Sequence, residues 1–247
     1  MAEANEKLEN LNFKLLELDK SKTLFLRLIS HEIRTPLNGI IGPVELLKKT
    51  YNIEDISTLV DILDISVRRL EKFSLEALLI TRLKTNPYEI KGVEIDLAKL
   101  ISKVLEDEKG DVESKELKIK YKYESANNIV IGEPQLIEKS LVNVFKNAIQ
   151  YSPQKGSVET VVLSRGDDVI LQISNEGEGF PASILEHAFE LFTSGSGHQD
   201  SRYGIGLPVA KLIMEAHNGD VRIKNRKQGG ACVQLVFRHK DSDQMII

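Results

Sequence analysis

The sequence contains a single cysteine, Cys232, and has no apolar run long enough to cross a membrane. One cysteine excludes a framework of intrachain disulfides and fits a reducing compartment. A membrane-spanning helix needs about 18 consecutive apolar residues, and the Glu- and Asn-rich beginning of the chain lacks the pattern of a signal peptide. We therefore expect a cytoplasmic chain without membrane contact of its own, which leaves open a longer, membrane-tethered parent.

A strong excess of charge of one sign is also missing. The chain has 33 Lys and Arg residues against 37 Asp and Glu residues, a formal net charge of −4 at pH 7. This balance gives no electrostatic case for nucleic acid or an anionic membrane as the main partner. The 247 residues, 41% of them hydrophobic, suffice to bury proper cores in one domain or two.

Two stretches of helical periodicity occupy the beginning of the chain. Apolar residues recur three or four positions apart between residues 3 and 49, which predicts one long amphipathic helix, and heptad-like spacing over residues 8–18 indicates a coiled-coil entry. A second helical pattern starts near Ile56 and ends near Asn86 and Pro87. Two antiparallel helices bury too little apolar surface alone, so we expect residues 1–86 to form a hairpin that dimerises into a four-helix bundle. An intramolecular hairpin docked on the rest of the chain is the alternative.

From Tyr88 onward, short β-like runs alternate with helical stretches. The patterns predict strands over residues 117–123, 158–164 and 169–174 and helices over residues 97–108 and 134–151. We therefore expect an α+β domain over residues 87–247. Neither a Walker A motif nor a GxGxxG fingerprint after a strand is present, so phosphate binding here would need another design.

The first predicted helix places a titratable ring beside a carboxylate. Ile29 and Ile33 flank His31 by two positions each, so at about 100° per residue they point away from it, and the imidazole should face solvent. A neutral imidazole has a ring nitrogen with a free lone pair that can attack phosphorus. Glu32 could accept the proton from the other nitrogen as a general base, and Thr35 lies one helical turn along the same face.

Residues 30–37, which read Ser-His-Glu-Ile-Arg-Thr-Pro-Leu, resemble the H-box of two-component sensor histidine kinases. The resemblance implies that His31 takes the γ-phosphoryl group of ATP and passes it to an aspartate in the receiver domain of a response regulator. For Thr35 it implies a part in dephosphorylating that regulator. From the residues alone, a histidine that merely decorates a solvated helix face is the competing interpretation.

The helix predicted over residues 134–151 carries a polar stripe made of Asn143, Asn147 and Gln150. Side-chain amide oxygens suit a hard cation such as Mg²⁺, which shares its remaining ligands with phosphates. A buried or capping Asn is the alternative for each of them, and spacing alone leaves the choice open. Residues 141–148 resemble the N-box of GHKL-type ATP-binding domains, which implies that Asn147 binds magnesium.

Three further segments resemble boxes of the same domain. They are residues 173–181 (G1 box), 189–192 (F-box) and 203–207 (G2 box), and the polar, glycine-rich residues 193–202 are predicted to form a lid. A glycine lets the backbone approach a ligand closely, and a helix N-terminus offers N–H groups to phosphates. The resemblance assigns these residues to the ATP pocket: Asn143, Asn147, Gln150, Tyr151, Asn175, Gly177, Gly179, Phe192, Gly204, Gly206 and Leu207.

The sequence departs from the family pattern at three positions. Asn175 stands where the family has the aspartate that binds the adenine amino group, Gln150 stands where a lysine is usual, and Ala231 stands where threonine is common. Each departure removes a charge or a hydroxyl group from the ATP pocket. Two functions follow as hypotheses: the core of a sensor histidine kinase that uses ATP and Mg²⁺, and a degenerate pseudokinase or signalling scaffold with weak or lost ATP binding.

Overall fold

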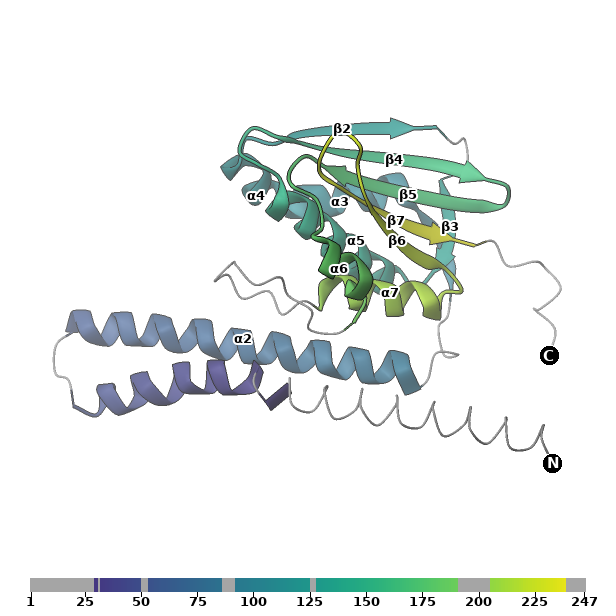
Figure 1. The fold of residues 1–247 in the computed structure, drawn as a ribbon. Coiled ribbons are helices and arrows are strands. Elements are labelled where there is room, and N and C mark those ends of the chain that lie inside the picture. Colours follow the sequence, from purple (N-terminus) through teal and green to yellow (C-terminus); the bar gives the residue numbers. More distant parts are fainter. Residues whose placement is uncertain are drawn as a thin grey trace, which may run out of the picture. The chain divides into compact units, whose positions relative to one another are not determined.

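The computed structural model describes residues 29–30, 32–49, 53–85, 92–124, 128–190 and 205–238. The chain forms two compact units, Met1–Leu79 and Ile80–Ile247, which divide inside helix α2, Ile53–Thr85 (Figure 1). The division between residues 86 and 87 stays a prediction. The predicted coiled-coil entry, the predicted lid and three candidate site residues, His31, Phe192 and Gly204, lie outside the described residues.

The first unit contains a pair of helices that lie side by side. Residues 32–47 are helical, and the helix continues through Pro36 and Pro43, both of which are buried. Gly39 faces Ser66 of α2 so closely that a Cβ at Gly39 would collide with the Ser66 hydroxyl group. The missing side chain therefore lets the two helices approach each other, as the predicted hairpin requires. In the described part of the chain, no helix is long and apolar enough to span a membrane.

The second unit is built on a five-stranded mixed sheet, which confirms the predicted α+β class. Its strand order is β2 (Lys118–Tyr123), β4 (Ser157–Arg165), β5 (Asp168–Asn175), β7 (Ala231–Phe237) and β6 (Asp220–Asn225). Only β2 and β4 are parallel, and the other neighbours are antiparallel. A separate two-stranded antiparallel sheet pairs β1 (Val93–Asp96) with β3 (Ile129–Gly132).

Helices cover one side of the five-stranded sheet (Figure 1). They are α3 (Leu97–Asp107), α5 (Pro134–Tyr151) and α7 (Gly206–Ala216), with the shorter α4 (Lys109–Ser114) and α6 (Ala182–His187) beside them. Helix α5 packs against α3, α7 and β5, and its side chains Leu141, Val144 and Phe145 are fully buried. This packing fixes α5, and with it the polar stripe on its other face.

Candidate nucleotide-binding site

The polar stripe of α5 lies at the margin of this core. Asn143, Asn147 and Gln150 are half-buried, and Tyr151, the last residue of the helix, is exposed. The sequence folds this way because the apolar positions between them, which include Leu141 and Phe145, take the buried face of an amphipathic helix. Pro134 at the start of α5 favours the helix there because its φ is already helical and the N–H that it lacks would have no intrahelical partner.

Asn143 faces the beginning of α7. A Cβ at Gly206 would lie 3.7 Å from Asn143 Cβ and 3.9 Å from its Oδ1, which is ordinary contact distance. The side-chain Nδ2 of Asn143 is buried and has no hydrogen-bond partner among the described residues. A buried unpaired amide costs about 1–3 kcal/mol, so the geometry favours a partner from outside the described residues. Within the described ranges, helix α7 likewise has no side-chain hydrogen bond at its N-cap, Ile205.

The G1 segment, residues 173–181, approaches the end of α5 and the end of β6 through its two glycines. Gly177 has φ +146°, and a Cβ there would lie 2.5 Å from the carbonyl oxygen of Tyr151. Gly179 has φ +83°, and a Cβ there would lie 2.7 Å from Oδ1 of Asn225. Asn225 accepts a hydrogen bond from the Phe180 amide at 2.7 Å and donates one to the Phe180 carbonyl at 2.8 Å. Glycine is therefore required sterically at both positions, and Asn225 fastens the segment.

Asn175 ends strand β5 and is buried on the helix-covered side of the sheet, with 4% of its surface exposed. Its Nδ2 donates a hydrogen bond of 2.9 Å to the carbonyl oxygen of Glu176. Its own carbonyl oxygen accepts one of 3.3 Å from Nη1 of Arg226. The Nδ2 bond orients the side-chain amide so that Oδ1 is the atom able to accept a further hydrogen bond, and the Arg226 bond holds the backbone of the same residue.

Glu176 is held by the neighbouring strand rather than by the pocket. Its carboxylate accepts hydrogen bonds from the Ser157 hydroxyl group at 2.8 Å and from the Ser157 amide at 3.0 Å. The hydroxyl bond is the main reason that the pKa of Glu176 lies below its ordinary value. Glu176 therefore anchors the G1 segment to β4 as a carboxylate.

Lys115 is a site-positioning residue that the sequence patterns did not indicate. Its ammonium group donates to the carbonyl oxygens of Ile149, Gln150 and Ser152 at 3.1, 2.5 and 3.0 Å. These carbonyl groups end α5, where the helix dipole is negative and intrahelical donors are missing. Lys115 therefore fixes the turn that carries Gln150 and Tyr151, from 35 positions away in the sequence.

The structure brings only part of the predicted site together. It places Asn143 against Gly206 and the Tyr151 carbonyl against Gly177. Leu207, on the first turn of α7, is buried. The side chains of Asn147 and Gln150 share no hydrogen bond with the G1 segment within the described residues. Glu32, half-buried, and Thr35, exposed, belong to the other unit. No group of three or more His, Cys, Asp or Glu residues that could hold a metal ion occurs in the described ranges.

Comparison with known proteins finds two family models that match successive parts of the chain. Residues 132–241 match the model of the histidine kinase-, DNA gyrase B- and HSP90-like ATPases. Residues 21–86 match the model of the His Kinase A phospho-acceptor domain. Both matches fall on the segments that carry the H-box, the N-box and the glycine boxes.

Individual relatives match most of this chain but only part of their own length. The heme sensor protein HssS of Staphylococcus saprophyticus is 28% identical over 93% of this chain and 49% of its own. Sensor protein KdpD of Clostridium acetobutylicum is 31% identical over 87% of this chain and 24% of its own. The chain thus spans about half the length of these relatives or less.

Solved structures share the fold at lower identity. Histidine kinase AdeS of Acinetobacter baumannii superposes with a TM-score of 0.67 at 20% identity and covers 85% of this chain and 98% of its own. Histidine kinase ThkA, solved in complex with response regulator protein TrrA, superposes with a TM-score of 0.71 at 20% identity, over 91% of this chain and 63% of its own. At this level of identity the likeness concerns the fold.

Proposed function

The chain belongs to the two-component sensor histidine kinases, and from that premise we propose that it transfers the γ-phosphoryl group of ATP to His31 and then to an aspartate of a response regulator. In the first step the bond between phosphorus and the ADP oxygen breaks as a bond from phosphorus to an imidazole nitrogen forms. Glu32 would take the proton from the other ring nitrogen. In the second step the phosphoryl group leaves the imidazole for a carboxylate oxygen, which restores His31.

One observation carries the assignment of the nucleotide to the second unit. The side chain of Asn143 lies against Gly206 at the start of α7, and its buried Nδ2 has no hydrogen-bond partner among the described residues. Within the same residues, the N-cap of α7 has no side-chain hydrogen bond either. A phosphate group satisfies both needs, because its oxygens accept hydrogen bonds and its charge is stabilised by the positive end of a helix dipole. The Oδ1 of Asn175 would then accept the bond from the adenine amino group.

The amide of Asn147 fits a magnesium ion in the type of donor atom that it offers. It lies half-buried one turn from Asn143 on the same helix. Mg²⁺ prefers oxygen ligands and shares its coordination between protein side chains and phosphate oxygens, whose charge it would neutralise. Asn147 would hold the ion, and positioning by the surrounding backbone would supply most of what phosphoryl transfer requires.

We further propose that the first unit dimerises and that its exposed surface binds the regulator. The solved ThkA structure contains a response regulator, which supports a partner of this kind for the present chain. Thr35 is exposed one helical turn beyond the position of His31, so its hydroxyl group could orient a water that attacks the phosphorylated regulator.

A pseudokinase remains the second candidate function because the three departures stand at buried or half-buried positions. Asn175 and Ala231 are buried, and Gln150 is half-buried. None of them adds a charge that would replace the one expected from the family pattern. A chain with this pocket could retain the dimer and the regulator-binding surface while it binds ATP weakly.

Incubation with γ-labelled ATP and Mg²⁺ separates the two functions. A histidine kinase yields a label that is lost in acid and stable in base, as a phosphoramidate is, and His31→Gln abolishes it. His187→Gln is the matched control, since His187 is exposed and lies in the other unit, and it should keep full labelling. Label that survives in His31→Gln contradicts the proposal. Absence of both label and nucleotide binding in the unmodified chain establishes the pseudokinase.

A further inference from the structure

The side of the sheet that faces away from the helices carries a hollow of about 460 Å³. Register shows which side chains reach that side: Glu159, Ser174, Cys232 and Lys224 occupy one cross-strand row over β4, β5, β7 and β6. Asn175 and Ala231 are their neighbours in sequence and therefore point to the helix-covered side. The hollow and the candidate nucleotide site thus lie on opposite faces of the same sheet.

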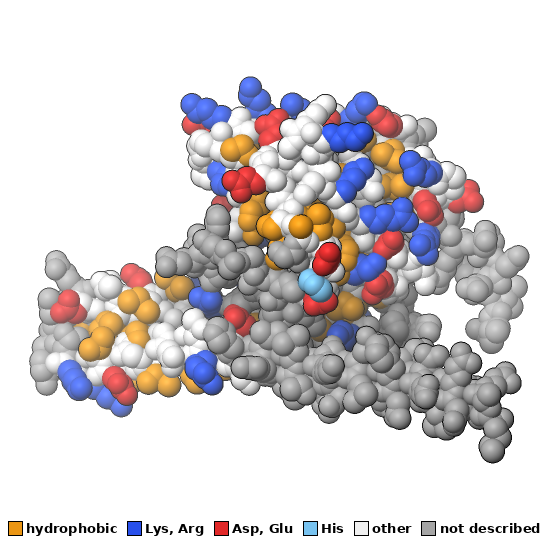
Figure 2. All heavy atoms as spheres, in the orientation of Figure 1, with side chains coloured by type: hydrophobic (Ala, Val, Ile, Leu, Met, Phe, Trp, Pro, Cys, Tyr) orange, Lys and Arg blue, Asp and Glu red, His pale blue; other side chains and the backbone are white. Residues whose placement is uncertain are grey.

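The turn between β6 and β7 forms the rim of the hollow. Arg226 and Lys227 line the hollow from this turn and Lys224 lines it from β6, whereas Ser174 and Cys232 are buried beneath. Figure 2 shows several Lys and Arg side chains, with Asp and Glu side chains among them, on the face of this unit that is turned to the viewer. A volume of 460 Å³ is within the range of small-molecule sites, which are about 300–1,000 Å³.

Three cations surround the hollow against a single carboxylate, Glu159. Nη2 of Arg226 lies 4.0 Å from Oε2 of Glu159, at the outer limit of an ion pair, and Lys224 and Lys227 form no ion pair within the described residues. Burial raises the pKa of the Cys232 thiol, so the floor stays uncharged at neutral pH. Glu176, which does not line the hollow, also interacts electrostatically with Arg226. Among the lining residues, positive charge therefore exceeds negative charge.

Arg226 is already oriented for a ligand. Nη1 donates to the Asn175 carbonyl at 3.3 Å, and Asn225, its neighbour in the chain, is held by two hydrogen bonds to Phe180. A guanidinium group fixed in this way loses little conformational entropy on binding and can present its remaining N–H groups to an oxyanion. Ser174 adds a hydroxyl group at the floor.

We propose that this hollow is a binding site for a phosphate group, either free phosphate or the phosphate of a small metabolite. Three cations within one small site suit a doubly charged, compact oxyanion better than a single carboxylate. The site lies outside the proposed ATP pocket, and phosphate binding here does not depend on the proposed kinase activity.

The single cysteine provides a direct test on the whole chain. Labelling with ¹⁵N-cysteine gives one amide resonance, that of Cys232 beneath the hollow. Titration with inorganic phosphate at constant ionic strength should shift this resonance saturably. The double variant Lys224→Ala/Lys227→Ala should weaken binding at least tenfold. A parallel titration with glycerol 3-phosphate distinguishes the sources, because tighter binding of this ester identifies a metabolite as the ligand and tighter binding of phosphate identifies the free ion.

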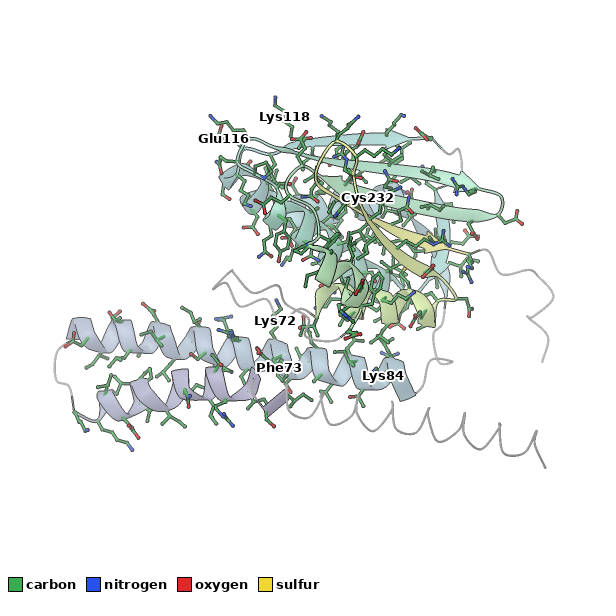
Figure 3. All side chains as sticks on the ribbon, in the orientation of Figure 1. Lys72, Phe73, Lys84, Glu116, Lys118 and Cys232 are labelled. Carbon is green, nitrogen blue, oxygen red and sulfur yellow. The ribbon has the colours of Figure 1, made fainter. Side chains whose placement is uncertain are left out.

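Lys118→Ala/Lys122→Ala is the matched control. These two lysines lie on β2 on the same side of the sheet but do not line the hollow, and Figure 3 shows Lys118 apart from Cys232. The control variant therefore removes the same amount of positive charge from outside the hollow. Binding should stay within twofold of the unmodified chain. An unmoved or non-saturating resonance overturns the proposal, and so does equal weakening by the two double variants, which would mean general charge attraction. If phosphate instead binds in the ATP pocket, Lys224→Ala/Lys227→Ala leaves its affinity unchanged. That result also overturns the proposal.

Discussion

Asn175 combines two requirements that a carboxylate could not meet together. Its Nδ2 donates to the Glu176 carbonyl at 2.9 Å, whereas its Oδ1 is left for the proposed adenine contact. In Asn175→Asp a carboxylate oxygen would face the Glu176 carbonyl oxygen, and neither of them can donate a hydrogen bond. The proposed contact with the adenine amino group would become a charge-assisted hydrogen bond. Hydrogen bonds to a charged partner contribute about 1.5–3 kcal/mol against about 0.5–1.5 kcal/mol for neutral pairs.

We therefore predict that Asn175→Asp binds ATP several-fold more tightly and unfolds at a lower temperature than the unmodified chain. A gain of about 1 kcal/mol in binding corresponds to that factor in affinity. Calorimetry at fixed Mg²⁺ measures the affinity, and thermal unfolding without nucleotide measures the stability. Unchanged affinity would mean that the pocket is adapted to the amide, and the pseudokinase would lose its main support.

His217 gives the second unit a predictable pH dependence. Its Nε2 accepts a hydrogen bond of 3.0 Å from the Glu133 amide at the start of α5, and its Nδ1 donates one of 2.7 Å to the Ile213 carbonyl. This arrangement requires the neutral ring, and burial lowers the pKa of His217 below its ordinary 6.5. Below pH 6.5 the unfolded state therefore binds a proton that the folded state does not bind.

We predict that the free energy of unfolding falls as the pH drops below 6.5 and that His217→Gln flattens this dependence. Urea unfolding between pH 5 and pH 8 measures it. His187→Gln is the control of opposite sign, because the Glu190 hydrogen bond raises the pKa of His187, so that its contribution is present at low pH and is lost as the pH rises. A slope that His217→Gln leaves unchanged would assign the dependence to other groups.

At the scale of elements, α5 connects the two ends of the candidate site, and Lys115 determines how it ends. Removing the ammonium group leaves the carbonyl groups of Gln150 and Ser152 without this donor, whereas the Ile149 carbonyl keeps the Ser152 amide at 3.4 Å. We predict that Lys115→Ala lowers the free energy of unfolding by about 1–2 kcal/mol, from the lost helix-dipole interaction and charge-assisted hydrogen bonds. It should also weaken ATP binding, because Gln150 and Tyr151 lie in the released turn.

Urea unfolding and an ATP titration measure both effects for Lys115→Ala. The matched control is Lys118→Ala, which removes an exposed lysine of β2 and should change neither quantity appreciably. Loss of stability without loss of ATP affinity would limit Lys115 to a structural role.

Long periodic elements could be predicted from the sequence, whereas the shortest strands could not. The helices expected over residues 97–108 and 134–151 and the three expected strands agree with the structure to within one or two residues. Strand β7 was not predicted although its burial resembles that of β5: six of its seven residues are buried, against six of eight in β5. Strands β1 and β3 have four residues each and pair across more than 30 positions, which leaves no local signal.

The candidate site divides in the same way. Residues within one motif, such as Asn143 on α5 or the glycines of the G1 segment, could be predicted because their spacing is local. Lys115 and Arg226 contact the site from distant parts of the chain, and nothing in their own surroundings in the sequence distinguishes them from other surface cations.

At the scale of the whole molecule, the proposed reaction needs groups from both units, since His31 belongs to Met1–Leu79 and the ATP pocket to Ile80–Ile247. The first unit exposes large apolar side chains in rows along its helices. One row on α2 contains four apolar side chains that are 36–65% exposed and lie within about 40° of one another around the helix: Ile56, Val60, Val67 and Leu78. Ile33, Leu37 and Val44 form a similar exposed stripe on the preceding helix. Such contiguous patches indicate an interface.

We predict that Val60→Glu/Val67→Glu converts a dimer into a monomer. A charge at two adjacent positions of the stripe would have to be buried without a partner in a four-helix bundle, at a cost of several kcal/mol. Sedimentation velocity measures the mass over a range of concentrations.

The matched control is Ile65→Glu, because Ile65 is 65% exposed and lies about 150° around α2 from the stripe, so this variant should stay dimeric. A monomeric unmodified chain, or a control that dissociates equally, would contradict the assignment of the interface to this face. If the monomeric double variant still labels His31 from ATP, the phosphoryl group reaches His31 within the same chain. If labelling is lost and returns on mixing with unmodified protein, the phosphoryl group is transferred between chains.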